Sequence, residues 1–336
     1  TNSDGITAVV TLLATVDNSA ITFSSSPSTF YGLAAQADDG VAVQLGITAT
    51  TSYLYLDAAY DDSSDDTNTA QFADTVTVTA ATLLTLESTT GSLVPAGSLT
   101  LAAAAGVVLH DDMTAAASNK PLVINADSDG SGDGTLTVQS GKTVTSNKSD
   151  VTITAYDLDM AGSLTAGTLS IVVHGAQASQ TIGIGTGLSQ NMEILDAELG
   201  SLTAEGGLTV GRATGGEIQV KGVTDGSSDS VGTITLVATR DATAVSFLSA
   251  ASAFNKGIVV QAMGGVVLSE SVTTKNLPTV IFAGTGTLKS LANKSLVSTN
   301  QLLTLTADDV DIQGDAVSSG SAVMTVTTAT AAKSVG

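Results

Sequence analysis

The sequence predicts an all-β fold in which short strands wind around a narrow core and stack as a β-solenoid. Three observations point to it: short apolar runs with period-two spacing, turns at Gly, Asp and Asn, and internal repeats. The pattern is clearest at 151–174, VTITAYDLDMAGSLTAGTLSIVVH. Each apolar run there is too short for a helix, and the alternation places Thr and Asp on the face opposite Val and Ile. Gly162 and Gly167 mark the corners between runs.

The composition favours stacked layers over an ordinary globular core. The chain has 336 residues, with 3% aromatic residues, no Trp and 4 Pro. Large globular cores use Phe, Tyr and Trp to fill irregular volume, whereas rows of Val, Leu, Ile and Ala fill a regular tunnel. The 43% of hydrophobic residues and the mean hydropathy of +0.32 argue against disorder.

The net charge and the absence of cysteine argue against several classes of binding partner and site. The net charge is -21, from 11 basic and 32 acidic residues, which argues against binding to nucleic acid or to an anionic membrane surface. The absence of Cys excludes disulfides and thiolate metal sites. No stretch reaches the roughly 18 apolar residues of a membrane span, so we expect no membrane insertion. No signal-peptide pattern opens the chain, so any export signal is expected to have been removed.

The first internal repeat joins two segments at one constant offset. Residues 12–30 read LLATVDNSAITFSSSPSTF, and residues 236–254 read LVATRDATAVSFLSAASAF. A further match follows, between QADDGVAV at 36–43 and QAMGGVVL at 261–268. Repeats of this kind are the sequence signature of solenoid proteins.

A second repeat, at a smaller offset, shows that the second copy is shortened, while the first repeat sets the boundary between the copies. TAYDLDMAGSL at 154–164 matches TADDVDIQGDA at 306–316. We therefore expect residues 1–231 to form the first long repeat unit and residues 232–336 to form a second, partial copy that continues the same solenoid. The second copy lacks a block equivalent to roughly 45–105. A solenoid tolerates the loss of coils because each coil contacts only its neighbours.

Strand candidates recur along the whole chain and are separated by Gly, Asp, Asn and Ser. In chain order they include the apolar runs at Val76, Leu84, Leu99, Val107, Leu122, Leu136, Ile153, Leu169, Leu208, Ile218, Ile234, Ile258, Val266, Val280, Leu303 and Met324. No stretch has a convincing 3.6-residue apolar period. The nearest helix candidate is Met192 to Leu202, which is short.

These residues resemble a known group. DVTITAYDLDMAGSLTAGTLSIVVHG, from Asp150, is similar to the coils of filamentous-haemagglutinin-like β-helix repeats. ILDAELGSLTAEGGLTVGRATGGEIQVKGVT, from Ile194, resembles a module of very large secreted or surface repeat proteins of bacteria and algae. The resemblance implies a right-handed parallel β-helix, a single elongated domain of stacked coils, in an exported structural or adhesive protein. It carries no catalytic residues.

Three acidic, glycine- or serine-rich turns are candidate cation sites: 61–66, 127–134 and 224–230. In the second, Asp127, Asp129 and Asp133 offer hard oxygen ligands suited to Ca²⁺. The turn lacks the Glu at the twelfth position of an EF-hand loop and does not recur with a short regular period. The alternative is a solvated turn in which Asp and Gly serve the backbone geometry. Ca²⁺ is the one candidate cofactor.

Other polar residues give weaker indications of chemistry. Paired carboxylates such as Asp157 and Asp159 can serve hydrolysis, but their copy at Asp309 and Asp311 favours a solvated outer strand face. His110 and His174 are isolated, and Arg212 and Arg240 are expected at the surface. The glycines Gly183, Gly185 and Gly187 lack the lysine and helix of a phosphate loop.

The sequence as a whole predicts a non-enzymatic, secreted or cell-surface structural protein. We expect copies of it to stack end to end into a filament, or the solenoid to form part of a longer surface fibre, because exposed strand edges at the ends can pair. The first alternative is an adhesin or carbohydrate-binding stalk whose partner is a surface glycan. The second is a β-helix polysaccharide lyase or hydrolase, against which the few Lys and Arg residues argue.

Overall fold

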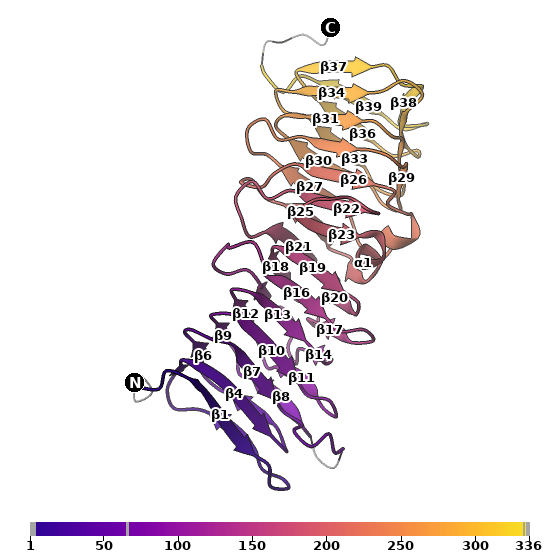
Figure 1. The fold of residues 1–336 in the computed structure, drawn as a ribbon. Helices are drawn as coiled ribbons and strands as arrows, with labels where there is room; N and C mark the ends of the chain where they lie inside the picture. Colours follow the sequence, from indigo (N-terminus) through magenta and orange to yellow (C-terminus); the bar gives the residue numbers. More distant parts are fainter. Residues whose placement is uncertain (1–4, 65–66, 332, 334–336) are drawn as a thin grey trace. The chain divides into compact units, whose positions relative to one another are not determined.

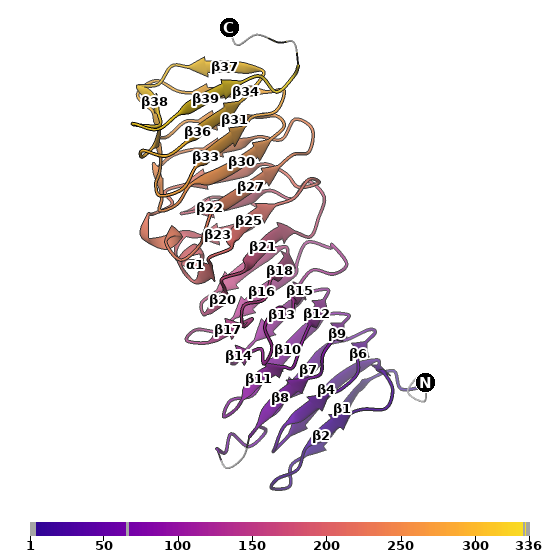
Figure 2. The ribbon, with the colours of Figure 1, turned by 180° about the vertical axis from the view of Figure 1, so that it is seen from behind.

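The described chain consists almost entirely of short parallel β-strands. The computed structural model describes residues 5–64, 67–331 and 333, and it divides into two compact units, unit 1 (Thr1–Leu169) and unit 2 (Ser170–Gly336). Within each unit the strands stack in coils, as Figures 1 and 2 show from opposite sides. The expected all-β solenoid is therefore confirmed. The repeat boundary at 231 is defined by sequence similarity alone and stays a prediction.

Unit 1 has three faces, because every third strand pairs in parallel. The first face orders β1 (Val9–Ala14), β4 (Gly32–Ala37), β7 (Leu54–Asp57), β10 (Leu83–Glu87), β13 (Gly106–Leu109), β16 (Thr135–Val138) and β19 (Asp157–Met160). The second orders β2 (Ile21–Phe23), β5 (Val41–Val43), β8 (Thr69–Phe72), β11 (Ser92–Pro95), β14 (Met113–Thr114), β17 (Thr143–Thr145) and β20 (Ser163–Gly167). The third orders β3 (Ser28–Phe30), β6 (Ile47–Ala49), β9 (Val76–Ala80), β12 (Leu99–Ala103), β15 (Leu122–Asn125) and β18 (Val151–Ala155).

Unit 2 follows the same three-strand cycle for most of its length. One face orders β21 (Ser170–Gly175), β25 (Gly207–Gly211), β27 (Ile234–Ala238), β30 (Ile258–Ala262), β33 (Thr279–Phe282), β36 (Leu303–Thr306) and β39 (Met324–Thr327). The next orders β23 (Met192–Leu195), β22 (Ile182–Gly185), β26 (Ile218–Lys221), β28 (Val245–Phe247), β31 (Gly265–Leu268), β34 (Thr287–Ser290) and β37 (Asp309–Ile312). The last orders β29 (Ser252–Phe254), β32 (Val272–Thr274), β35 (Ser295–Ser298) and β38 (Ala316–Ser318).

The start of unit 2 departs from this cycle. The predicted helix candidate at Met192 to Leu202 divides into strand β23, helix α1 (Asp196–Gly200) and the beginning of β24 (Leu202–Ala204). Within the next turn of the chain, the short 3₁₀ helix η1 (Gly226–Ser228) packs against α1. Only an isolated bridge, Ala204 to Val231, continues the ladder from β24. Helix α1 and η1 are the only helical segments among the described residues.

The core consists of apolar side chains at equivalent inward-facing positions, stacked from coil to coil. Along the third face of unit 1, Val76, Leu99, Leu122 and Val151 pair in register, and each is at most 4% exposed. Their outward neighbours are Thr or Val, so the period of two places apolar side chains inside and β-branched side chains outside. Burial of one such Leu or Val stabilises the fold by roughly 1.5–3 kcal/mol.

The two sequence copies fold alike at their start. Phe23 and Phe30 meet edge to face with ring centroids 6.3 Å apart, and their counterparts Phe247 and Phe254 do so at 6.5 Å. In both copies the strand with the first ring and the strand with the second ring pair with the strands three places on. The repeat detected in the sequence is thus a repeat of local structure.

Candidate functional site

The acidic turn of unit 1 brings the three predicted ligands together. It joins β15 to β16, and one carboxylate oxygen from each of Asp127, Asp129 and Asp133 lies within 4.8 Å of the others. Asp127 is 2% exposed and accepts hydrogen bonds from the backbone N–H of Gly132 at 3.1 Å and from the Ser131 hydroxyl at 3.4 Å. Asp129 accepts from the Ser131 N–H at 3.0 Å. Asp129 and Asp133 are exposed.

Burial and repulsion shape the charge of this turn. Burial raises the pKa of Asp127, and the neighbouring Asp129 carboxylate adds to the increase, while the Gly132 N–H partly offsets it. The pKa of Asp129 is lowered, first by the Ser131 N–H that it accepts. A cation bound to both carboxylates would remove the repulsion that disfavours their simultaneous ionisation.

The residues present fit part of a calcium shell. Ca²⁺ takes 6–8 oxygen ligands at 2.3–2.6 Å from carboxylates, carbonyls and water. Three carboxylates in one turn supply the anionic share of such a shell, and backbone carbonyls and water would have to supply the rest. Calcium binding at this turn stays a prediction.

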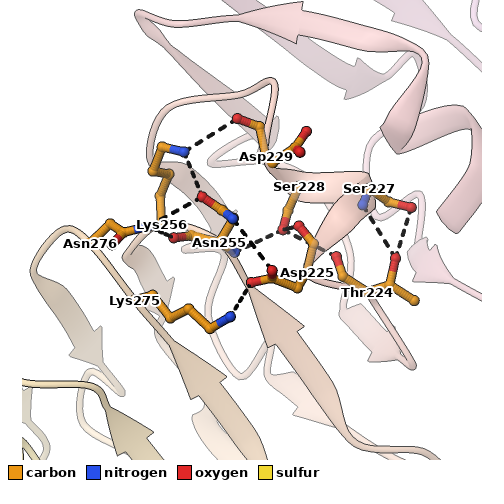
Figure 3. Close-up of polar contacts among 9 residues, drawn as sticks. All are labelled: Thr224, Asp225, Ser227, Ser228, Asp229, Asn255, Lys256, Lys275 and Asn276. Carbon is orange, nitrogen blue, oxygen red and sulfur yellow. Dashed lines mark hydrogen bonds and ion pairs between the residues drawn. The ribbon is translucent and has the colours of Figure 1, made fainter.

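The third acidic turn, at 224–230, has a different role. Figure 3 shows its polar side chains engaged with those of the next coils. Asp225 forms an ion pair with Lys275 at 2.8 Å, and Asn255 donates to its other carboxylate oxygen at 3.4 Å. Lys256 donates to the Asn255 side-chain oxygen at 2.6 Å and to the Asp229 carbonyl at 3.3 Å. The Lys275 contact lowers the pKa of Asp225. These contacts join successive coils at a corner of unit 2.

The first acidic turn, at 61–66, is described in part. Residues 65 and 66 lie outside the described residues. Asp61 accepts a hydrogen bond from the Ser63 N–H at 2.9 Å, which closes a local turn. The three acidic turns, similar in sequence, therefore differ in what their carboxylates contact.

The duplicated carboxylate pairs lie on strands at the end of a face. Strand β19 carries Asp157 and Asp159 and is the last strand of its face in unit 1, and β37 carries Asp309 and Asp311 and is the last of its face in unit 2. Asp311 pairs with Lys289 at 3.0 Å, and Thr287 donates to Asp309 at 3.0 Å. On β37 both carboxylates are therefore held by side chains of the neighbouring strand β34.

The remaining singled-out residues have structural contacts. Burial lowers the pKa of His174. Arg212 and Arg240 each donate to a backbone carbonyl, at 2.7 and 3.0 Å. Gly185 has φ +110°, and a Cβ there would lie 2.0 Å from the carbonyl oxygen of Lys221 on β26. This glycine is therefore required for close strand pairing, in agreement with the rejection of a phosphate loop.

In the terminal coils the apolar side chains that face inward are partly exposed. Met324 and Val326 on β39 pair with Leu303 and Leu305 on β36. They are 45% and 38% exposed, whereas Leu303 and Leu305 are 0% and 3% exposed. No described strand pairs with the other edge of β39.

The first coil shows the same arrangement. Val10 and Leu12 on β1 are only half-buried, although their partners Leu33 and Ala35 on β4 are 0% exposed. No described strand pairs with the outer edge of β1. Both ends thus expose apolar side chains beside unpaired backbone groups.

Comparison of the chain with protein-family models, with curated proteins and with solved structures gave no match in any of the three. The resemblance to filamentous-haemagglutinin-like repeats stays a prediction, although the stacked coils that it implies are present. Over residues 5–64, 67–331 and 333, no helix is long and apolar enough to cross a membrane.

Proposed function

We propose that the protein is a non-enzymatic structural element of the cell exterior, a β-solenoid protomer that stacks head to tail into a filament. The observation that carries the proposal is the pair of open coil ends. At each end an inward apolar row is partly exposed next to an unpaired strand edge. A further coil would cover the row and pair the edge, as every internal coil does.

A second copy offers a matching set of strands. The first coil presents β1, β2 and β3, with 6, 3 and 3 residues, and the last presents β37, β38 and β39, with 4, 3 and 4 residues. Placing β1 on β37, β2 on β38 and β3 on β39 keeps all three pairs parallel and continues the three-strand cycle. The partner proposed here is therefore another copy of this chain.

The proposed location and the lack of catalysis have separate support. A secreted or cell-surface location is supported by the sequence resemblance. A role without catalysis is supported by the duplication of the paired carboxylates at terminal strands, because an active site seldom needs two copies in one chain.

Electron microscopy and sedimentation of the purified chain test the proposal. We expect filaments or a concentration-dependent series of oligomers. Val326→Asp places a charge in the exposed inward row and should leave a folded monomer, as judged by circular dichroism. The matched control is Thr325→Asp, on the outward face of the same strand, which should assemble like the unaltered protein.

Two results would overturn the proposal. One is an unaltered protein that stays monomeric at high concentration. The other is a Val326→Asp variant that assembles as readily as the Thr325→Asp control. Repeating the microscopy with a chelator shows whether divalent cations are needed to bridge the acidic surfaces.

One feature favours a carbohydrate-binding stalk as a second candidate. A surface pocket of about 400 Å³ lies at the corner of unit 2 where the ladder from β24 is interrupted. Its lining includes Glu205, Asp229, Lys256 and Leu277, a mixture of hydrogen-bonding and apolar groups that suits a sugar ring. A glycan array with the unaltered chain and with Glu205→Gln tests this candidate, and equal signals from both would exclude this pocket.

A further inference from the structure

Five polar residues form a column along one corner of unit 1. Strands β4, β7, β10, β13 and β16 pair in register, so the residues at or just beyond their C-terminal ends lie one above another on the outer face. In coil order these residues are Gln36, Asp57, Glu87, His110 and Gln139. Neighbouring strands are about 4.8 Å apart, which brings consecutive side chains of the column within contact range.

The two carboxylates of this column, Asp57 and Glu87, form no ion pair with a described basic side chain. Asp57 and Glu87 are in-register neighbours on β7 and β10, a position in which like charges repel. The Tyr55 hydroxyl lies between them, 2.6 Å from Glu87 Oε2 and 3.2 Å from an Asp57 oxygen. None of the ion pairs in the described part of the chain includes Asp57 or Glu87.

Glu87 and His110 each have two side-chain atoms that can bind a metal. One of the two forms a hydrogen bond, and the other has no described partner. Glu87 Oε2 accepts from Tyr55, and no described group bonds to its Oε1. His110 Nδ1 lies 3.1 Å from the side-chain amide of Gln139, and no described group bonds to its Nε2. The two side chains line the same surface pocket of about 300 Å³. The only ammonium group in that pocket, on Lys142, is already paired with the buried Asp111.

We propose that Glu87 and His110 form a binding site for a divalent transition metal of the Zn²⁺ or Cu²⁺ type. Imidazole selects these metals over Ca²⁺ and Mg²⁺, and a carboxylate completes a mixed nitrogen and oxygen ligand pair. The metal would also neutralise the repulsion between Asp57 and Glu87. Water molecules in the open pocket supply the remaining ligands.

The partners of the two ligands act as positioning residues. In metal sites a ligating histidine commonly hydrogen-bonds through its other ring nitrogen, and a ligating carboxylate is itself hydrogen-bonded. The amide nitrogen of Gln139 lies 3.1 Å from His110 Nδ1. Gln139 meets the first condition once this amide is turned over, so that its oxygen accepts the Nδ1 proton and Nε2 is left free for the metal. Tyr55 meets the second for Glu87.

Copper electron paramagnetic resonance tests the histidine ligand. The chain has only two histidines, so a version without a histidine tag gives an unambiguous assignment. With one equivalent of Cu²⁺ we expect the electron spin echo modulation of a coordinated imidazole. The signal should disappear in His110→Gln and persist in His174→Gln. Loss in the second variant, or persistence in the first, would overturn the proposal. The frozen sample can be monomeric or filamentous, so this result is independent of the proposed assembly.

Zinc calorimetry tests the carboxylate ligand. Glu87→Gln keeps an acceptor for Tyr55 but removes the charge, and we expect it to weaken Zn²⁺ binding at least about tenfold. Glu217→Gln is the matched control, because Glu217 is an exposed acid in unit 2 and should leave the affinity unchanged. An equal affinity of the Glu87→Gln variant and the control would refute the role of Glu87. Circular dichroism confirms that each variant is folded.

Discussion

Single carboxylates in this chain respond to pH in opposite directions. Because the pKa of Asp127 is raised in the folded state, its contribution to stability is present below its unfolded pKa and is lost as the pH rises through its folded pKa. The pKa of Asp129 is lowered, so its contribution is present above its unfolded pKa and is lost as the pH falls. A cation bound at this turn would stabilise the ionised form of the buried Asp127.

Calcium should raise the thermal unfolding temperature at pH 7. A ligand at 100 times its Kd stabilises the folded state by about 2.7 kcal/mol. The increase should shrink as the pH falls through the raised pKa of Asp127, because protonation removes the charge of this ligand, and it should be lost in Asp129→Asn. The control Asp17→Asn removes an exposed acid elsewhere in unit 1. Scanning calorimetry with Ca²⁺ and with a chelator measures the effect, and an equal increase in both variants would place calcium elsewhere.

Glycines at coil corners are required where another backbone approaches. A Cβ on Gly257 would lie 1.8 Å from the carbonyl oxygen of Pro278 in the next coil, whereas a Cβ on Gly226 would meet nothing within 4 Å. We expect Gly257→Ala to lower the free energy of unfolding by about 2 kcal/mol through overpacking and Gly226→Ala to leave it nearly unchanged. Urea denaturation of the two variants checks the difference, and similar midpoints would contradict it.

The sequence predicts individual turn residues well and the candidate sites only in part. Asn276 and Asn300 have φ values of 58° and 53°, as expected for Asn at turns. The three ligands of the acidic turn could be found because they are close in the sequence. The pair of Glu87 and His110 could not, because their proximity depends on which strands stack and in which register.

At the scale of elements, the alternating pattern was sufficient to predict short strands and turns. The second copy lacks a block of the first, and the sequence alone did not show how many strands that block spans. Strand β31 matches β5 through the repeat of 36–43 at 261–268, and its sequence, GVVL, is also that of β13. Yet β5 and β13 lie on different faces of unit 1. The deletion is therefore not a whole number of coils, which a sequence offset alone cannot show. The segment Met192 to Leu202 was only the nearest helix candidate, because its apolar run is too short to distinguish strand β23 from helix α1, and it contains both.

The two aromatic pairs should contribute unequally to stability. Phe254 is 2% exposed between coils of unit 2, whereas Phe30 in the first coil is only half-buried. We expect Phe254→Ala to cost about 3–5 kcal/mol in the free energy of unfolding of its unit and Phe30→Ala to cost clearly less. Hydrogen exchange resolved by segment measures the loss around each site. Equal losses would mean that the first coil is as tightly packed as an internal one.

At the scale of the whole molecule, assembly has to overcome electrostatic repulsion. Each copy carries a net charge of -21, so copies repel one another along their length. Raising the ionic strength from 0.01 to 0.15 M shortens the screening length from about 30 to about 8 Å. We expect filaments to be longer at the higher ionic strength, as measured by electron microscopy, because the apolar contacts at the coil ends are little affected by salt. Shorter filaments would indicate that ion pairs rather than apolar rows hold the copies together.

A variant blocked at one end should act as a cap. Val326→Asp alters the last coil and leaves the first coil intact, so one such molecule can add through its β1 edge to the last coil of a filament. The aspartate at its own last coil then prevents further addition. Small amounts mixed with unaltered protein should therefore shorten filaments in proportion to the fraction added, whereas Thr325→Asp should not. If filament length is unaffected by the capping variant, assembly does not proceed through the coil ends, even if filaments form.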